Sequence, residues 1–257
     1  MTIKSYGRSA AALAAAGALL ALPTILLPAA DAAPVSALVH AQSQRQSEST
    51  LAGTGLTLDL HQAIDLDAQG IAVKAVDGAR MDDSAVILPV DKGSKITYGK
   101  KVTGGTVRLQ GGIQLSKGEK KLTISNVAYD LETGALRGKF GSQPNIRFAT
   151  IRHPDSAAIV LEDNSTIATL KLAAGDGIEL SADFFAALDK ALGTTLSSDM
   201  DVSTGIDIDA TLDVDVDLAN GKELNADLIT ALGLDDSIDA SAGVDGLLDL
   251  NVDIDLL

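Results

Sequence analysis

The chain contains no cysteine and no tryptophan, and aromatic residues of all kinds make up only 3% of it. Without cysteine it can form neither a disulfide framework nor a thiol-linked lipid anchor. With so few aromatic side chains, we expect none of the stacking surfaces that bind carbohydrate or single-stranded nucleic acid. The net charge of −15 also disfavours polyanionic partners such as nucleic acid. The core must therefore be built mainly from aliphatic side chains.

Residues 1–32 have the pattern of a secretion signal. The basic residues Lys4 and Arg8 precede an apolar stretch, Ala10–Leu27, and the small residues Ala30-Asp31-Ala32 follow as a cleavage site. A membrane anchor is the alternative, because the apolar stretch is about as long as a short spanning helix. Two prolines near the end of the stretch favour removal. We therefore expect an exported protein, secreted or associated with the cell wall, with no membrane span after signal removal.

Residues 33–50 end in a polar, aperiodic run and are predicted to form a flexible leader. From residue 51 to 198, short segments of alternating hydrophobicity are separated by glycine-containing turns such as Gly104-Gly105. Alternate residues of a strand point to opposite faces, so this period of two indicates strands buried on one side. The sequence predicts a mainly β domain, an antiparallel sandwich or barrel with a few short helices, one of them at about His61–Ala68.

The charge is concentrated at one end of the chain. Residues 1–198 contain equal numbers of acidic and basic residues, whereas residues 199–257 contain 16 acidic residues and a single base, Lys222. This break predicts a domain boundary, or at least the start of a separate functional surface. We therefore distinguish a β domain at 51–198 from an acidic repeat region at 199–257.

Two segments of the acidic region, Ile206–Leu218 and Val244–Leu256, share one amphipathic pattern. In an extended strand, mostly aliphatic residues would occupy one face and mostly aspartates the other, with Leu247 as the one lapse. Each segment is therefore expected to bury its aliphatic face and to expose its acidic face to water.

A predicted helix precedes each amphipathic segment. Gly177–Leu188 and Gly221–Leu232 share seven of twelve residues. Ser181 and Asn225 are placed as the N-caps of these helices. The C-terminal part is thus predicted to be an acidic, doubled helix-strand unit that packs on the preceding sheet or on itself.

Asp213, Asp215 and Asp217 begin like a calcium-binding loop. An EF-hand loop, however, needs Gly at its sixth position and Glu at its twelfth, where this chain has Leu218 and Leu224. On one strand face the carboxylates would lie roughly 7 Å apart, too far for one ion to gather all three. Two interpretations stay open: a solvated outer face that discourages aggregation, and calcium bound at the surface between strands.

Three segments resemble the Htaa domain of exported actinobacterial proteins: Lys101–Leu115, Lys121–Val127 and Asp130–Leu136. The resemblance covers about residues 51–195 and rests on strand and glycine patterns. It implies a β-rich fold and, for true members of the family, haem capture through a tyrosine with histidine support.

The candidate ligands under this resemblance are His61, Tyr98 and Tyr129. The stretch Leu60–Ala63 matches the family's tyrosine-bearing helix, and it carries His61 and no tyrosine. Tyr98 and Tyr129 lie elsewhere in the domain, with packing in a strand as their alternative role. A haem or another small ligand would use one or more of these three residues.

No catalytic motif surrounds His61 or His153, the two histidines of the mature domain, so we expect no enzymatic activity. The sequence favours an exported, non-enzymatic protein of the cell envelope or extracellular medium with a structural, adhesive or binding role. Its partner would be an envelope component or a second copy of the chain. The alternative is a haem- or other small-ligand-binding protein of the Htaa type. No resident cofactor is expected, with haem and calcium as the two candidates.

Overall fold

The strands and helices are known for most of the chain beyond residue 45. The computed structural model describes residues 46–61, 63–151, 158–161, 166–173, 177–199, 201 and 205–235. Four predictions concern residues that lie wholly or mostly outside these ranges: the secretion signal at 1–32, the flexible leader at 33–50, the lack of a catalytic role for His153, and the second amphipathic segment at 244–256.

Short strands make up most of the described residues. In chain order they are β1 Ser47–Leu58, β2 Ala72–Val76, β3 Arg80–Asp82, β4 Ala85–Leu88, β5 Lys95–Tyr98, β6 Val102–Arg108, β7 Gly112–Lys117, β8 Lys120–Asp130, β9 Ala135–Phe140, β10 Gln143–Ile151, β11 Ala158–Leu161, β12 Ile167–Ala173, β13 Ile178–Leu180, β14 Ile206–Ile208, β15 Ala210–Asp217, β16 Ala219–Asn220 and β17 Glu223–Leu224. The helices are α1 Ala182–Leu192, α2 Leu196–Asp199 and α3 Ala226–Ala231.

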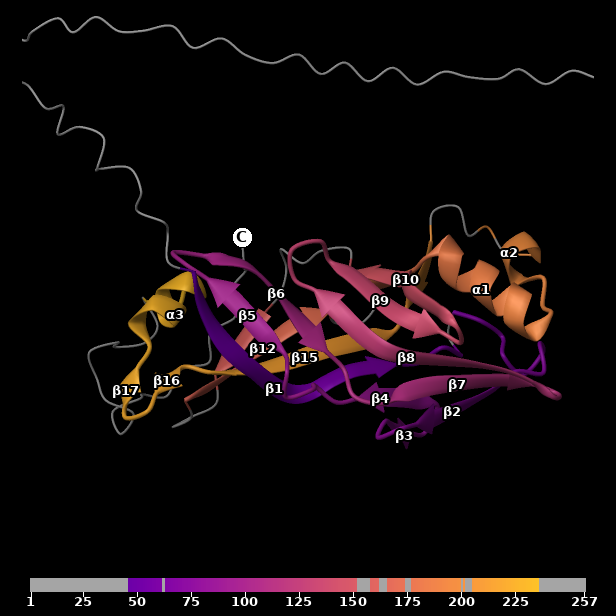
Figure 1. The fold of residues 1–257 in the computed structure, drawn as a ribbon, viewed down its shortest axis with the longest axis horizontal. Helices are drawn as coiled ribbons and strands as arrows, with labels where there is room; N and C mark the ends of the chain where they lie inside the picture. Colours follow the sequence, from indigo (N-terminus) through magenta and orange to yellow (C-terminus); the bar gives the residue numbers. More distant parts are fainter. Residues whose placement is uncertain are drawn as a thin grey trace, which may run out of the picture. The chain divides into compact units, whose positions relative to one another are not determined.

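The fold is mainly β, which confirms the fold class predicted from the alternating segments. The strands form a curled antiparallel sheet, a half-barrel, in the order β11-β12-β15-β1-β5-β6-β8-β9-β10-β13-β14 (Figure 1). β7 and β2 extend it beside β8, and β4 and β3 extend it beside β1. The helices α1 and α3 lie at opposite ends of the sheet (Figure 1).

Strand β1 belongs to two parts of this sheet. Its first residues, Ser47–Thr50, pair with β5, whereas Leu51–Leu58 pair with β15. An extra residue between Ala52 and Gly55 forms a β-bulge near the change of partner, where bulges bend a strand. The prediction of a flexible leader at 33–50 is therefore wrong for Ser47–Thr50. Backbone hydrogen bonds to β5 hold this polar segment in the sheet. Because these bonds do not depend on the side chains, no hydrophobic pattern in the sequence indicated the strand.

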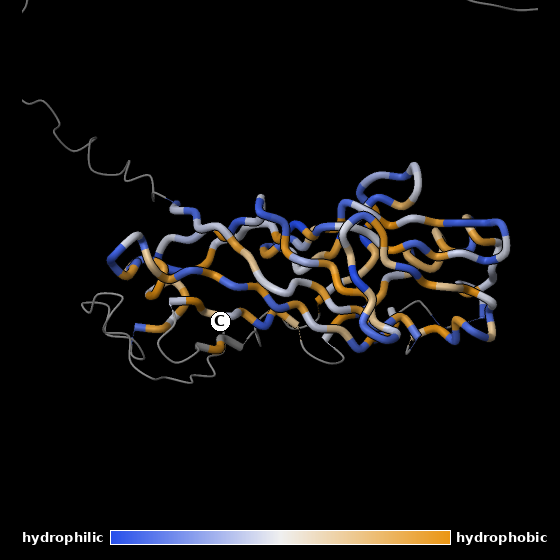
Figure 2. The backbone as a smooth tube through the Cα atoms, turned by 90° about the horizontal axis from the view of Figure 1, so that it is seen from below, coloured by the Kyte–Doolittle hydropathy of each residue, from blue (hydrophilic) through white to orange (hydrophobic). Residues whose placement is uncertain are grey.

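The first amphipathic segment lies inside the sheet. β14 pairs with β13, and beyond Asp209 β15 pairs with β1 on one side and β12 on the other. Val214 and the alternate aliphatic residues from Ile208 to Leu218 are buried, whereas the residues between them are half-buried or exposed. Figure 2 shows this alternation of hydrophobic and hydrophilic positions along the strands. The two-faced strand predicted for Ile206–Leu218 is confirmed.

The expected boundary at residues 198/199 does not divide the described residues. All of them belong to one compact unit, and β15 is an internal strand between β1 and β12. The aspartates alter only the solvent side of this sheet. β15 shares its backbone hydrogen bonds and its buried aliphatic side with β1 and β12 of the preceding region. The change in surface charge at residue 199 therefore does not mark the start of a separate domain.

The predicted helix caps are present in α1 and α3. Ser181 Oγ accepts a hydrogen bond from the Phe184 N–H at 3.3 Å, and Asn225 Oδ1 accepts one from the Leu228 N–H at 3.1 Å. These side chains satisfy backbone donors that a helix start leaves unpaired. Gly193 ends α1 in the left-handed conformation that favours glycine.

The four phenylalanines of the chain meet around α1. Phe184 and Phe185 of α1 contact each other, and Phe184 also contacts Phe140 of β9 and Phe148 of β10. Their ring centroids lie 5.3–6.4 Å apart, within the range of favourable edge-to-face and tilted contacts. The phenylalanines thus attach α1 to β9 and β10 of the sheet.

The helix predicted at His61–Ala68 is wrong, because the described residues of this segment form successive turns. Asp59 Oδ1 accepts the His61 N–H, and Asp65 Oδ1 accepts the Ala68 N–H, each at 3.0 Å. Such local side-chain acceptors compete with the helical hydrogen-bond ladder.

Candidate functional site

The two tyrosines proposed as ligands are buried in the core. Tyr98 is 3% exposed, and Asn225 Nδ2 donates a 2.9 Å hydrogen bond to its hydroxyl oxygen. Tyr129 is 1% exposed. Burial, with a smaller effect of the neighbouring Asp130 charge, raises the pKa of Tyr129 to about 12. Both tyrosines therefore pack in the core, which was the alternative to ligand binding, and neither is placed to reach a ligand from solvent.

Tyr98→Phe is expected to lower the free energy of unfolding by about 1 kcal/mol, because it removes one hydrogen bond. Asn225→Ala should cost about 2 kcal/mol, since it removes the same bond and also the cap of α3. Urea unfolding of the two variants and of the double variant tests this. The double variant should be no less stable than Asn225→Ala, because both changes break one shared bond. Fully additive losses would contradict a direct contact.

The three aspartates considered for calcium are held separately along the outer face of β15. Asp215 accepts a 2.6 Å hydrogen bond from Thr169 Oγ1 on β12. Asp217 accepts the Ala219 N–H at 2.9 Å, so it caps the turn after the strand. Among the residues that the structure describes, no three His, Cys, Asp or Glu side chains are grouped to hold a metal ion. The fold does not bring Asp213, Asp215 and Asp217 together around one ion.

Asp213 has the most altered environment of these three carboxylates. Partial burial raises its pKa, and the charge of Asp215 adds to the rise, whereas Lys171 lowers it. Lys171 lies directly opposite Asp213 in the ladder between β12 and β15. This face therefore combines aspartates with a lysine and a threonine, as expected for a solvated outer face.

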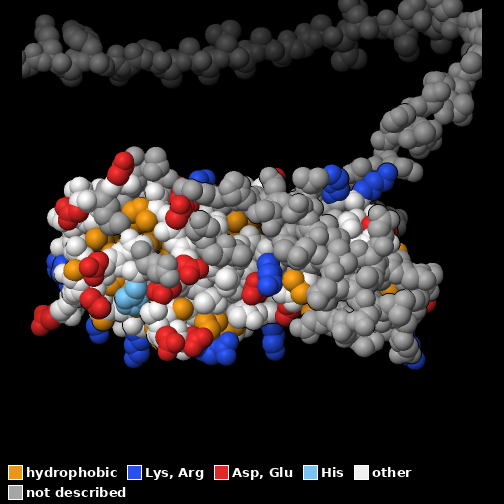
Figure 3. All heavy atoms as spheres, turned by 180° about the vertical axis from the view of Figure 1, so that it is seen from behind, with side chains coloured by type: hydrophobic (Ala, Val, Ile, Leu, Met, Phe, Trp, Pro, Cys, Tyr) orange, Lys and Arg blue, Asp and Glu red, His pale blue; other side chains and the backbone are white. Residues whose placement is uncertain are grey.

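His61 lies at the surface, beside an open hollow of about 500 Å³. Figure 3 shows acidic and hydrophobic side chains gathered around the histidine on this face. The lining combines one histidine, two carboxylates, one hydroxyl, one thioether and small or aliphatic residues: His61, Asp67, Gly70, Ile71, Ala72, Val73, Met81, Asp83 and Ser84.

Asp59 orients the His61 ring. One carboxylate oxygen lies 3.3 Å from His61 Nδ1, and the other accepts a 2.7 Å hydrogen bond from Ser84 Oγ. An ionised carboxylate can only accept, so Nδ1 carries the hydrogen and Nε2 is the acceptor of the neutral ring. The three residues are not a catalytic triad, because the carboxylate lies between hydroxyl and imidazole, whereas a nucleophilic serine donates to the histidine. The arrangement instead fixes the tautomer that could bind a ligand through Nε2.

Ser84→Ala is expected to raise the pKa of Asp59. Burial alone would raise that pKa, but hydrogen bonds from Ser84 and His61 outweigh it and hold the pKa below its ordinary value. A carboxyl with a lowered folded-state pKa adds stability above its unfolded pKa of about 3.9, and this contribution is lost as the pH falls through the folded value. The variant should thus be less stable than the wild type near neutral pH, and the difference should shrink in acid. NMR titration of the carboxyl measures the pKa of Asp59, and urea unfolding at neutral and at acidic pH measures the stability of both proteins. A stability difference between variant and wild type that does not change with pH would contradict the prediction.

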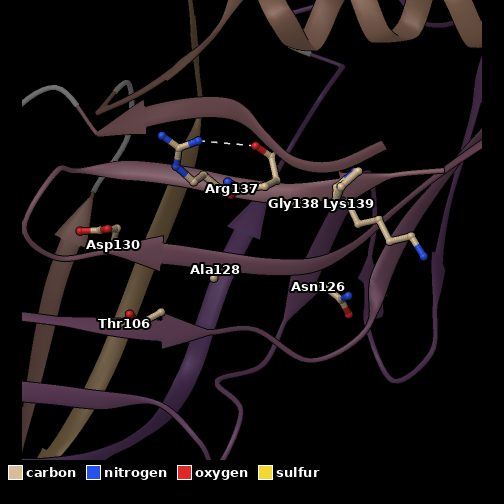
Figure 4. A pocket seen from close by; sticks show the side chains of 9 residues that line it. Thr106, Asn126, Ala128, Asp130, Arg137, Gly138 and Lys139 are labelled. Atoms are coloured by element: carbon tan, nitrogen blue, oxygen red, sulfur yellow. Dashed lines mark hydrogen bonds between the residues drawn. The ribbon is translucent and has the colours of Figure 1, made fainter. Parts of the chain in front are cut away.

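A second hollow, of about 310 Å³, lies on the outer face of β6, β8 and β9 (Figure 4). Arg137 Nη1 donates to the backbone oxygen of Asn145 at 3.5 Å, marked by the dashed line in Figure 4. Charged, polar and small apolar residues line the hollow: Thr106, Asn126, Ala128, Asp130, Arg137, Gly138, Lys139, Pro144 and Asn145.

Two β-bulges border this second hollow. Opposite β9, β8 carries one extra residue and β10 carries two, and the bulge of β10 between Gln143 and Ile146 is the one that borders the hollow. Asn126 and Asn145 lie at these bulges with positive φ values of 52° and 58°, which asparagine tolerates better than most residues. This site was not among those predicted from the sequence. Its only sequence signal is an asparagine inside a strand segment, where asparagine is disfavoured.

Two further hollows continue the second one along the sheet. One, of about 390 Å³, shares Asn126 with it, and another, of about 330 Å³, shares Asp130. Arg108 lines both of these neighbouring hollows. We call Arg108, Asn126, Asp130, Arg137 and Lys139 the polar face. It lies on the outer side of β6, β8 and β9, while Val107, Tyr129 and Leu136 of the same strands are buried on the other side.

Comparison with protein-family models, curated proteins and solved structures found no match for this chain. Among the residues that the structure describes, no helix is both long enough and apolar enough to cross a bilayer. The resemblance to Htaa domains and the export of the protein therefore stay predictions.

Proposed function

We propose that this chain is an exported, non-enzymatic protein of the cell envelope or extracellular medium, and that it binds an envelope component through the polar face. The observation that supports this is the run of three adjoining hollows on the outer side of the sheet, lined by two arginines, two lysines, two aspartates and two glutamates. Side chains of both charges and an asparagine amide can together donate to and accept from a polar polymer.

The architecture supports a binding role rather than a catalytic one. The polar face is carried by strands whose inner side chains belong to the core, so its groups are held on rigid elements. Its hollows are shallow and shared between neighbouring strands, which suits an extended partner better than a small enclosed substrate. A partner of this kind would be a wall polysaccharide, bound mainly by hydrogen bonds and charge rather than by aromatic stacking.

Sedimentation with isolated, protein-free actinobacterial cell walls tests this proposal. The mature chain should sediment with the walls, and Arg137→Ala/Lys139→Ala should reduce the bound fraction at least tenfold. Lys74→Ala/Lys121→Ala is the matched control, because it also removes two positive charges from exposed positions outside the polar face. Absence of binding, or an equal loss in both double variants, would contradict the proposal.

The second candidate function is small-ligand binding of the haem-capture type. It is supported by the hollow beside His61 and by the carboxylate that orients the His61 ring. Titration with haemin should then shift the Soret band, and His61→Ala should abolish the shift. Because Tyr98 is buried, Tyr98→Phe should leave the shift intact. A titration without any Soret shift would contradict this candidate.

A further inference from the structure

Strand β11 forms one edge of the sheet. Its backbone pairs with β12, from Ala158 opposite Lys171 to Leu161 opposite Ala168. Among the described residues it has no strand partner on its other side. Such an edge presents a row of backbone N–H and C=O groups that another strand can use.

The C-terminal part of the chain returns to the same end of the sheet. The Leu218 N–H donates to the Thr166 oxygen at 2.7 Å, and the Asn225 N–H donates to the Leu218 oxygen at 2.7 Å. Thr166 immediately precedes β12, and β11 runs antiparallel to β12, so Leu161 lies beside this point. Helix α3 therefore begins close to the end of β11.

The length of the chain beyond α3 favours this edge over the edges at β3 and β14. Eight residues separate Asp235, where the described part ends, from Val244, and such a linker spans at most about 30 Å. β4, which carries β3, pairs with Leu56–Leu58, and these residues also pair with Ala210–Leu212. β14 precedes β15. The edges at β3 and β14 thus lie at the far end of β15, on the order of 25 Å from α3, so the linker would have to be almost fully extended to reach them.

We propose that Val244–Leu256 adds to the edge of β11 in the same molecule as an antiparallel strand. A strand that starts near α3 runs away from it, whereas β11 runs toward it, so the two directions are opposite. Ile206–Leu218 has the same amphipathic pattern and already lies in this sheet with its aliphatic side buried. The second segment would continue that buried side beyond β12. Its aspartates would face water and protect the new edge from further pairing.

Cysteine cross-linking tests the pairing directly, because the chain has no cysteine of its own. Val160 pairs with Thr169, so it shares the outer face of the sheet. Val160→Cys is combined in turn with a cysteine at the outer-face positions Asp249, Asn251 and Asp253, with Leu250→Cys as the inner-face control. We expect at least one outer-face pair to form a disulfide in more than half of the molecules at monomer mass. Covalent dimers would assign the edge to a second copy, and the absence of any cross-link would exclude the pairing. Either result overturns the proposal.

Hydrogen exchange on the full chain provides a second test. Leu250→Asp should increase exchange of the β11 amides at least tenfold while leaving β8 and β9 unchanged. Asn251→Asp adds the same charge to the outer face and should leave β11 protected. Equal exchange in the two variants would overturn the proposal, whatever the cross-linking yields.

Discussion

Val214→Asp is expected to abolish the folded state. Val214 is 0% exposed in β15, and β15 is an internal strand with a ladder on each side. A carboxylate there would be buried without a partner and would cost several kcal/mol. Because a domain is typically stable by only about 5–15 kcal/mol, most or all of the native population should be lost. Circular dichroism and urea unfolding would measure the effect.

The matched control for this change is Thr211→Asp, which adds the same charge to the outer face of the same strand. Thr211 is half-buried, so the new carboxylate can remain hydrated, and the expected loss is within about 1 kcal/mol. Asp215→Asn should also be nearly silent, because the amide oxygen can still accept the hydrogen bond from Thr169. Similar losses in Val214→Asp and Thr211→Asp would contradict the two-faced strand.

Gly55→Ala is expected to be the most damaging glycine substitution in β1. Gly55 has a φ of +82°, and an added Cβ would lie 2.1 Å from the Leu88 backbone oxygen and 2.9 Å from the Val90 nitrogen. Both neighbours are backbone atoms, so relief requires β4 to move away from β1 and breaks the pairing of Leu56 with Leu88. Together with the unfavourable φ, the loss should exceed about 3 kcal/mol.

Gly221→Ala separates the two contributions to that loss. Gly221 has a similar φ of +72°, but no heavy atom lies within 4 Å of its added Cβ. This variant should therefore show only the cost of a left-handed alanine, about 1 kcal/mol. The difference in urea midpoint between the two variants measures the close approach of β4. Equal midpoints would mean that β1 and β4 are not packed as described.

Local patterns predicted what local physics controls. The alternation in Ile206–Leu218 predicted its buried and exposed faces, because period-two burial follows from strand geometry alone. Ser181 and Asn225 were predicted as caps for the same reason, since a cap needs only the first turn of its helix. Where the side-chain pattern carried no signal, as at Ser47–Thr50, the prediction of a flexible segment was wrong.

The candidate site was less predictable, because it depends on contacts between distant residues. His61 was identified, but its orientation depends on Ser84, which reaches Asp59 from a different turn. The polar face depends on bulges in two strands on either side of β9, so no single segment carries its signature. Tyr98 could not be assigned to the core without its contact to Asn225, which lies 127 residues away in the chain.

The sequence by itself determined that the protein is built from short two-faced strands with aliphatic interiors, and where two of its helices begin. Only the tertiary structure decided that the acidic strand β15 lies between β1 and β12, that both candidate tyrosines are buried, and that charged residues of separate strands form one outer face. The physical reason is the range of the interactions. Strand periodicity and helix capping act over a few residues, whereas strand order and pairing register come from long-range backbone pairing that the local pattern permits in several ways.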